Sequence, residues 1–557
     1  MKKTALLVAS LILIPALAFG SVLFILHRAD TPDDESAVVT VSTEESSKTL
    51  SETEEMPSKP EPDATPDRYY IYTLLEDGTY EIAANVNVTL PERLVLPAEH
   101  KGKPVTRVAE NAFKGNTDIV SVVIPDSVIS IGSFAFSHCA ANPPDLYPEL
   151  YEGSSDPEEF KEKGLVSVTM TDSVTEIGEG AFSENFFLKE VRLSNGLTEI
   201  AKYTFRYCRE LESVIIPEGV TQIGAEAFDN CSGLTGIVIP ETVTSIGPTA
   251  FADCSGLTEI VIPESVVSIG QYAFRGCSGI TQIDIPKHVE SIEEGTFLFC
   301  DGLTGIVVPE NVVRVGYLAF SHCRSLTSIR VMNERIDFES NATAGCDSLI
   351  YSEYAGGLYL GDGANEYLLF VRPADAKAAS IDIAPATKCI AANAFLHNMN
   401  LVSVRLHEGL VRIGSSAFRM CAKLADIIIP QSVAEIGESA FLSAASFTQV
   451  TVPHGVSVIE YRAFYGCVRA GTVSVTEGVT HISEEAFFRC DSLKTVYLPK
   501  SLEYIGAKAF AQSNNIAEIC YPGTAEQWNA VKKEADWAEN SGRFTVRCSD
   551  GDIEISQ

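Results

Sequence analysis

The amino-acid sequence predicts a solenoid of about 16 repeats, each of 23 residues, mainly parallel β-structure with short helical or 3-10 turns. Three observations predict this fold: a recurring phenylalanine, a Cys or Asn three residues after it, and an alternating apolar segment that ends before Pro. The recurring phenylalanines are Phe113, Phe136, Phe182, Phe205, Phe228, Phe251, Phe274, Phe297, Phe320, Phe395, Phe418, Phe441, Phe464, Phe487 and Phe510.

The spacing of these phenylalanines is regular. Neighbours are 23 residues apart, except for a gap of 46 residues after Phe136 and one of 75 residues after Phe320. The first gap equals two periods, and the second equals three periods plus six residues. Because one repeat of this length cannot bury its apolar side alone, stacking of repeats must supply the core.

The repeat from Leu234 to Gly256 illustrates the expected elements in order. Ile237 and Ile239 alternate with polar or outward residues, which predicts a short strand, and Pro240 ends it. Val243–Gly247 predicts a second short strand, and the segment around Phe251 predicts a single helical or 3-10 turn. We expect parallel strands about 4.8 Å apart in successive repeats, with each phenylalanine buried on its neighbour.

Small side chains occupy the position three residues after the phenylalanine. Cys and Asn share it because both can donate to carbonyl groups that a tight turn buries. Metal binding or disulfides are the alternatives for the cysteines, but buried, reduced thiols are the simpler prediction. Cys389 is outside this pattern, at the position of Ser245, and we expect it to face solvent. The residues at the repeated position after the phenylalanine are Cys139, Cys208, Cys231, Cys254, Cys277, Cys300, Cys323, Cys346, Cys421, Cys467 and Cys490, with Asn116, Asn185 and Asn398.

The N-terminus predicts export. Lys2 and Lys3 precede an apolar run, so residues 1–28 are predicted to be a signal peptide or a signal-anchor transmembrane helix. Cleavage after Ala16-Leu17-Ala18 and retention as an anchor both remain open. Residues 29–66 are acidic and rich in Ser, Thr and Pro, which predicts a disordered linker. We therefore expect a secreted or cell-surface protein that contacts the membrane only through its N-terminal segment.

Composition excludes several function classes. The net charge of −34 is unfavourable for nucleic-acid binding, which needs Lys and Arg against phosphate. No C-x-x-C pair, G-x-S-x-G, H-E-x-x-H or P-loop motif occurs in the sequence. We predict no enzyme activity, no cofactor and no metal site.

The consensus L-x-x-[IV]-x-I-P-x-x-V-x-x-I-G-x-x-A-F-x-x-C resembles the BspA-like, or treponemal-type, leucine-rich repeat of bacterial surface proteins. The resemblance covers roughly residues 69–550 and implies a leucine-rich repeat solenoid that mediates adhesion to host or neighbouring cells. The expected organisation is an N-terminal cap at 67–104, a repeat block at 105–349 with an acidic loop insertion at 140–163, a hairpin insertion at 350–380, a second repeat block at 381–520 and a C-terminal cap at 521–557.

One residue per repeat points outward between the two inward residues of the first strand, on the sheet expected to be concave. Ile215, Val238 and Val261 are apolar at this position in neighbouring repeats. An exposed apolar stripe on a sheet is typical of a binding site, although β-propensity alone also favours Val and Ile there. The predicted binding residues are Ile215, Val238, Val261 and Val307, with Asp284, Arg192 and Arg330 as a charged border.

These features favour a non-enzymatic, exported, monomeric protein that binds a protein or glycan ligand on host or neighbouring cells, and that binds no nucleic acid. Two alternatives remain open. One is a cell-envelope enzyme or enzyme accessory acting on polysaccharide, which a pair of carboxylates in a cleft would indicate. The other is a structural spacer of the envelope, which a uniformly polar sheet face would indicate.

Overall fold

The computed structural model describes residues 63–141 and 163–556. These residues belong to one unit, Pro62–Gln557. The predicted membrane segment, nearly all of the predicted linker and most of the predicted acidic loop lie outside the described residues. In the part of the chain that is described, no helix has the length and apolar character needed to cross a membrane.

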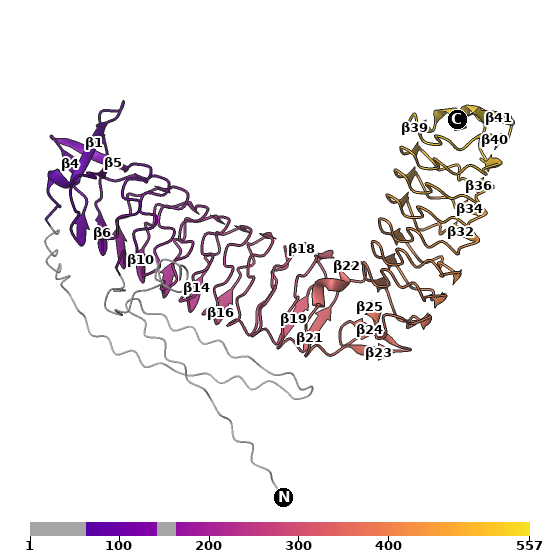
Figure 1. The fold of residues 1–557 in the computed structure, drawn as a ribbon, viewed down its shortest axis with the longest axis horizontal. Coiled ribbons are helices and arrows are strands. Elements are labelled where there is room, and N and C mark those ends of the chain that lie inside the picture. The colour runs from indigo at the N-terminus through magenta and orange to yellow at the C-terminus, as the bar shows by residue number, and fades with distance from the viewer. Residues whose placement is uncertain (1–62, 142–162, 557) are drawn as a thin grey trace, which may run out of the picture. The chain divides into compact units, whose positions relative to one another are not determined.

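Each repeat contributes two short strands and a tight turn that carries the phenylalanine (Figure 1). In the repeat at Leu234–Gly256 these are β14 (Gly236–Val238) and β15 (Ser245–Ile246). Strand β14 pairs in parallel with β12 (Ser213–Ile215) and β16 (Glu259–Val261), each offset by one period. The described residues form a parallel β-solenoid of about 19 turns with repeats of about 23 residues, which confirms the repeat length. The expected count of about 16 was too low, because it took in only the regular repeats and not the turns that the caps and the insertion add.

The strands form two series of ladders, one from the first strands and one from the second strands. The first strands are β3 (Arg93–Val95), β6 (Ser121–Ile124), β8 (Ser167–Met170), β10 (Glu190–Arg192), β12, β14, β16, β19 (Gly305–Val308), β21 (Ser328–Val331), β26 (Ser380–Asp382), β28 (Ser403–Arg405), β30 (Asp426–Ile427), β32 (Gln449–Val452), β34 (Thr472–Val475), β36 (Thr495–Tyr497), β38 (Glu518–Cys520) and β40 (Arg543–Cys548). The second strands are β5 (Lys103–Val108), β7 (Ser130–Ile131), β9 (Glu176–Ile177), β11 (Glu199–Ile200), β13 (Gln222–Ile223), β15, β17 (Ser268–Ile269), β18 (Ser291–Ile292), β20 (Arg314–Val315), β22 (Asp337–Phe338), β25 (Leu369–Pro373), β27 (Cys389–Ile390), β29 (Arg412–Ile413), β31 (Glu435–Ile436), β33 (Val458–Ile459), β35 (His481–Ile482), β37 (Tyr504–Ile505) and β39 (Lys532–Lys533).

The core contains a column of stacked phenylalanine rings. The ring centroid of Phe251 lies 5.3 Å from that of Phe228 and 5.5 Å from that of Phe274, and the ring planes are within 2° of parallel. All three side chains are fully buried. The prediction that these phenylalanines are buried and stacked is confirmed.

The cysteines of the repeat are also buried, and all fourteen cysteines are free thiols. The prediction that Cys389 faces solvent was wrong, because this residue is buried. Strand β25 from the insertion pairs with β27, and Leu369 lies opposite Cys389 in this pair. The Cys389 Sγ donates a hydrogen bond to the Glu334 carbonyl, and burial raises the pKa of this thiol to about 12.

Short antiparallel elements lie at both ends of the solenoid and at the insertion. The N-terminal end has η1 (Asp67–Tyr69), β1 (Tyr70–Leu74), β2 (Tyr80–Ala84) and β4 (Glu99–His100). The insertion has β23 (Ser352–Tyr354) and β24 (Gly357–Leu360), and β24 pairs with both β23 and β25. The 3-10 turn η4 (Ser340–Thr343) belongs to the repeat before the insertion. The C-terminal end has α1 (Ala525–Ala530), with a capping box from Thr524, and β41 (Gly551–Ser556).

Candidate binding face

Three apolar side chains form a stripe on the outer side of the first-strand ladder, which we call the Ile215 stripe: Ile215, Val238 and Val261. In the parallel register Ile215 lies opposite Val238, and Val238 lies opposite Val261. Their exposed fractions are 83%, 77% and 79%. Three β-branched aliphatic side chains on adjacent strands thus present one continuous apolar surface.

The alternation of the strand produces this exposure. In β12, Val214 and the following Ile216 point inward and are each 4% exposed, so Ile215 between them must point outward. The same alternation holds at Ile237 and Ile260 in the next two strands, which are also buried. The stripe therefore contributes little to the core, and its apolar side chains are available to a partner.

Arg192 lies at the start of the stripe and is tied to the preceding repeat. Its guanidinium donates to the Met170 carbonyl, and a second nitrogen lies 3.4 Å from Asp172 Oδ1. Both charged side chains remain about half exposed. This pair gives the stripe a charged edge on the N-terminal side.

Asp284 lies at the other end of the stripe, where the first-strand ladder is interrupted. Residues 281–286 form no strand, although Ile283 is buried and Asp284 is exposed, as in the other repeats. Beyond this interruption Val307 and Arg330 lie opposite each other in the separate pair β19 and β21. Val307 is only 37% exposed, and the backbone of Arg330 forms an isolated β-bridge with Gly361 of the insertion. The structure thus brings Ile215, Val238 and Val261 together and places Val307 with Arg330 in a second group.

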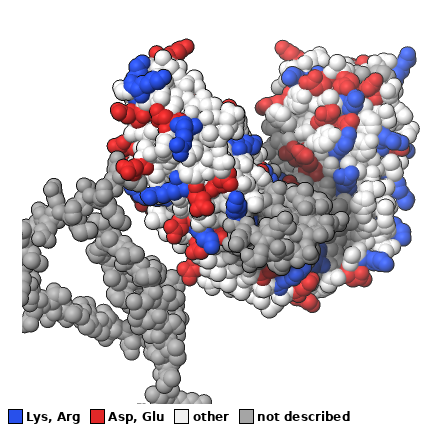
Figure 2. All heavy atoms as spheres, turned by 60° about the vertical axis from the view of Figure 1, so that its left-hand side comes forward, with Lys and Arg blue, Asp and Glu red and all other residues white. Residues whose placement is uncertain are grey.

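Charged side chains of both signs are interspersed over the face shown in Figure 2. Several charged side chains of the described residues pair between repeats, such as Arg206 with Asp229 at 3.1 Å and Lys189 with Glu210 at 3.2 Å. Among the described residues, no group of three or more His, Cys, Asp or Glu side chains could hold a metal ion.

Sequence reasoning missed a pocket between two repeats of the second block. It is lined by Ile427, Ile428, Ile429, Gln431, Phe447, Gln449, Val450, Thr451 and Phe464. Ile427 and Ile429 occupy positions that are buried in other repeats, so the sequence predicted core at this point. The available signal was Phe447, an aromatic residue at a position that holds Leu or Ile in most repeats.

The repeated strand pair, its Leu and Ile positions and the buried phenylalanine define a leucine-rich repeat protein. The BspA type leucine rich repeat region matches residues 106–235, 221–350 and 387–517, more than half of the chain. The chain belongs to this family, as its consensus indicated. No curated protein sequence matches the chain.

Several solved structures are similar to this chain. A leucine rich cell surface protein of Faecalibacterium prausnitzii is 25% identical, with 85% of this chain and 98% of that chain covered and a TM-score of 0.30. The T. pallidum leucine rich repeat protein is 24% identical, with 47% and 91% covered and a TM-score of 0.27. The pneumococcal vaccine antigen PcpA is 17% identical, with 86% and 97% covered and a TM-score of 0.29.

Proposed function

We propose that this chain is a non-enzymatic cell-surface protein that binds a protein partner through the Ile215 stripe. The observation that carries the proposal is the register of three apolar side chains, each more than three-quarters exposed. Strand faces in water are usually polar, and a contiguous exposed apolar strip is typical of an interaction site. The charged side chains of Arg192 and Asp284 would form the rim of the interface.

The chemistry of the stripe favours a protein over a glycan. Its side chains are aliphatic and carry no hydrogen-bonding group, whereas the centre of a protein interface is typically desolvated and apolar. A protein partner can bury all three side chains against its own apolar residues. A sugar would leave its hydroxyl groups without partners at the centre of the stripe.

We also propose that the protein is exported and that its N-terminal segment either anchors it or is cleaved. The apolar run behind Lys2 and Lys3 supports this proposal, as does membership of a family with surface proteins among its relatives. Fractionation with intact-mass measurement separates the anchored form from the cleaved form. Full-length protein in the cytosol would contradict both.

Site-specific photocrosslinking on intact partner cells tests the binding face. A benzoylphenylalanine at Val238 should capture one dominant partner protein. The matched control is the same residue at Val267, a valine directly before β17 that is 54% exposed. Capture at Val238 but not at Val267 supports the proposal, whereas equal capture at both positions, or capture at neither, contradicts it.

A further inference from the structure

Both ladders end between the same two repeats of the second block. Strand β30 is the last of its sheet and β32 is the first of the next, while β31 and β33 end and begin the second-strand ladders there. The phenylalanine side stays closed, because the Phe441 backbone N–H donates to the Ala463 carbonyl at 2.8 Å and the Phe441 and Phe464 rings stack at 5.3 Å. The two repeats are therefore joined at the phenylalanine column and unpaired along their strands.

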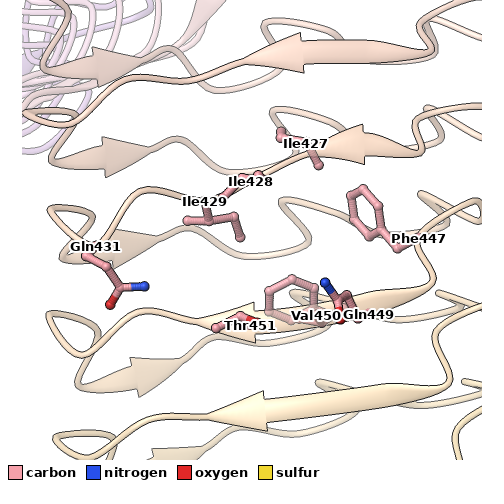
Figure 3. A pocket seen from close by; sticks show the side chains of 9 residues that line it. Ile427, Ile428, Ile429, Gln431, Phe447, Gln449, Val450 and Thr451 are labelled. Carbon is pink, nitrogen blue, oxygen red and sulfur yellow. The ribbon is translucent and has the colours of Figure 1, made fainter.

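A pocket of about 170 Å³ opens at this point. Figure 3 shows side chains of the segment with Ile427 and Ile429 and side chains of the segment with Phe447 and Val450 on the two sides of the gap. Ile427 and Ile429 are only partly buried, whereas the equivalent Ile237 and Ile239 are each 6% exposed. The pocket thus exposes side chains that elsewhere belong to the core.

Phe447 departs from the repeat consensus beside the gap. The neighbouring repeats have Leu424 and Ala470 at the corresponding position. The Phe447 ring is buried and stands edge-on to Phe441, with centroids 5.5 Å apart and planes at 63°. The gap is therefore bordered by a larger side chain than the neighbouring repeats carry at this position.

The lining defines the chemistry of a ligand. An apolar cavity of about 150 Å³ lined by Leu, Ile and Phe accommodates benzene, so this pocket has the size of one aromatic ring. The buried rings of Phe447 and Phe464 contribute to the apolar wall of the pocket, against which the edge of a bound ring can pack. The side chains of Gln449 and Thr451 form no hydrogen bond with another described residue, so they can bond to a polar group on the ring. We propose that this pocket binds a single aromatic ring with a hydrogen-bonding edge, of the phenol or tyrosyl class.

The proposal does not depend on the Ile215 stripe, and it is tested with the full-length chain. Saturation-transfer NMR with phenol should give saturable binding, with a Kd of about 1 mM for so small a ligand. Thr451→Trp, which fills the pocket from an exposed position, should weaken binding by about tenfold or more. Thr169→Trp is the matched control, because Thr169 occupies the same exposed strand position in β8 and does not line the pocket.

Gln449→Trp is a second variant that fills the pocket, and it is used in case Thr451→Trp does not fold. Circular dichroism checks that both variants are folded. N-acetyl-tyrosinamide as a second probe identifies the source of the ring. Binding of both probes indicates a side chain of a partner protein, and binding of phenol alone indicates a free small molecule. The proposal is overturned if phenol does not bind saturably, or if folded Thr451→Trp and Gln449→Trp bind it as the unmodified chain does.

Discussion

The Sγ of Cys254 donates a hydrogen bond to the carbonyl oxygen of Phe228, 3.1 Å away in the preceding repeat. The same bond joins Cys277 to Phe251 at 3.0 Å, again 26 residues apart. Two other residues at this position make the equivalent bond, since Ser513 Oγ donates to the Phe487 carbonyl at 3.1 Å and Asn185 Nδ2 donates to the Phe136 carbonyl at 2.8 Å. In these repeats the side chain satisfies a buried carbonyl of the preceding repeat, and the role of the cysteine is that of a small buried donor.

Replacement of Cys254 tests this role. Cys254→Ala should lower the local free energy of unfolding by about 1–3 kcal/mol, because the Phe228 carbonyl stays buried without a donor. Cys254→Ser should cost less, because serine makes this bond elsewhere in the chain. Hydrogen exchange of the amides in the two adjoining repeats measures the difference, and an equal loss for both variants would contradict the role.

The phenylalanine column should carry a larger share of the stability. Phe251→Ala should cost about 3–5 kcal/mol, because it removes a fully buried ring from between two others and leaves a cavity. In a repeat protein the loss should concentrate in the adjoining repeats. Urea denaturation followed by limited proteolysis checks the size and place of the effect, and a cost below about 1 kcal/mol would contradict the packing described.

Thiol reactivity should follow burial. Burial raises the pKa of Cys254, Cys277 and Cys389, so all three should alkylate slowly in the folded protein and rapidly in denaturant. Cys520 and Cys548 are partly exposed and should react first. Mass spectrometry after timed alkylation gives the order of labelling. Rapid labelling of Cys254 would show that the repeats open readily.

One hydrogen bond to a carboxylate gives a pH dependence with a defined sign. His138 Nδ1 donates to Glu184 Oε2 at 2.9 Å, and this bond holds the pKa of Glu184 below its usual value. Its stabilising effect is complete above the unfolded pKa of about 4.3 and is lost as pH falls through the lower folded pKa. Glu184→Gln should therefore destabilise the protein at pH 7 by less than about 1 kcal/mol, as is usual for an exposed pair, and by less still near pH 3. Melting temperatures at the two pH values check this, and the same loss at both would contradict it.

The period of the sequence was sufficient to predict the repeat, its buried phenylalanine and the outward side chains of the first strands. Each follows from local alternation and from a spacing that stacking converts into contacts between equivalent residues. Ile215 and Val238 illustrate this, since alternation within each strand exposes both side chains and the 23-residue spacing places them opposite each other.

Features that depend on departures from the period were not predictable in the same way. Cys389 was expected at the surface because its position is polar in other repeats, but β25 of the insertion pairs with its strand. The pocket at Ile427 lies where both ladders end, beside Phe447, although the strands there fit the consensus. In both cases the feature lies beside a residue or segment outside the regular pattern.

The affinity of the captured partner for a double lysine variant tests the central claim most directly. Val238→Lys with Val261→Lys should fold normally, because both side chains point away from the core. The loss of binding should be at least about 2 kcal/mol, or about thirtyfold in Kd, as at the centre of an interface. Val267→Lys with Val313→Lys is the matched control at positions directly before the second strands β17 and β20, which are 54% and 52% exposed, and it should bind normally. Normal affinity in a folded Val238→Lys and Val261→Lys variant would contradict the account.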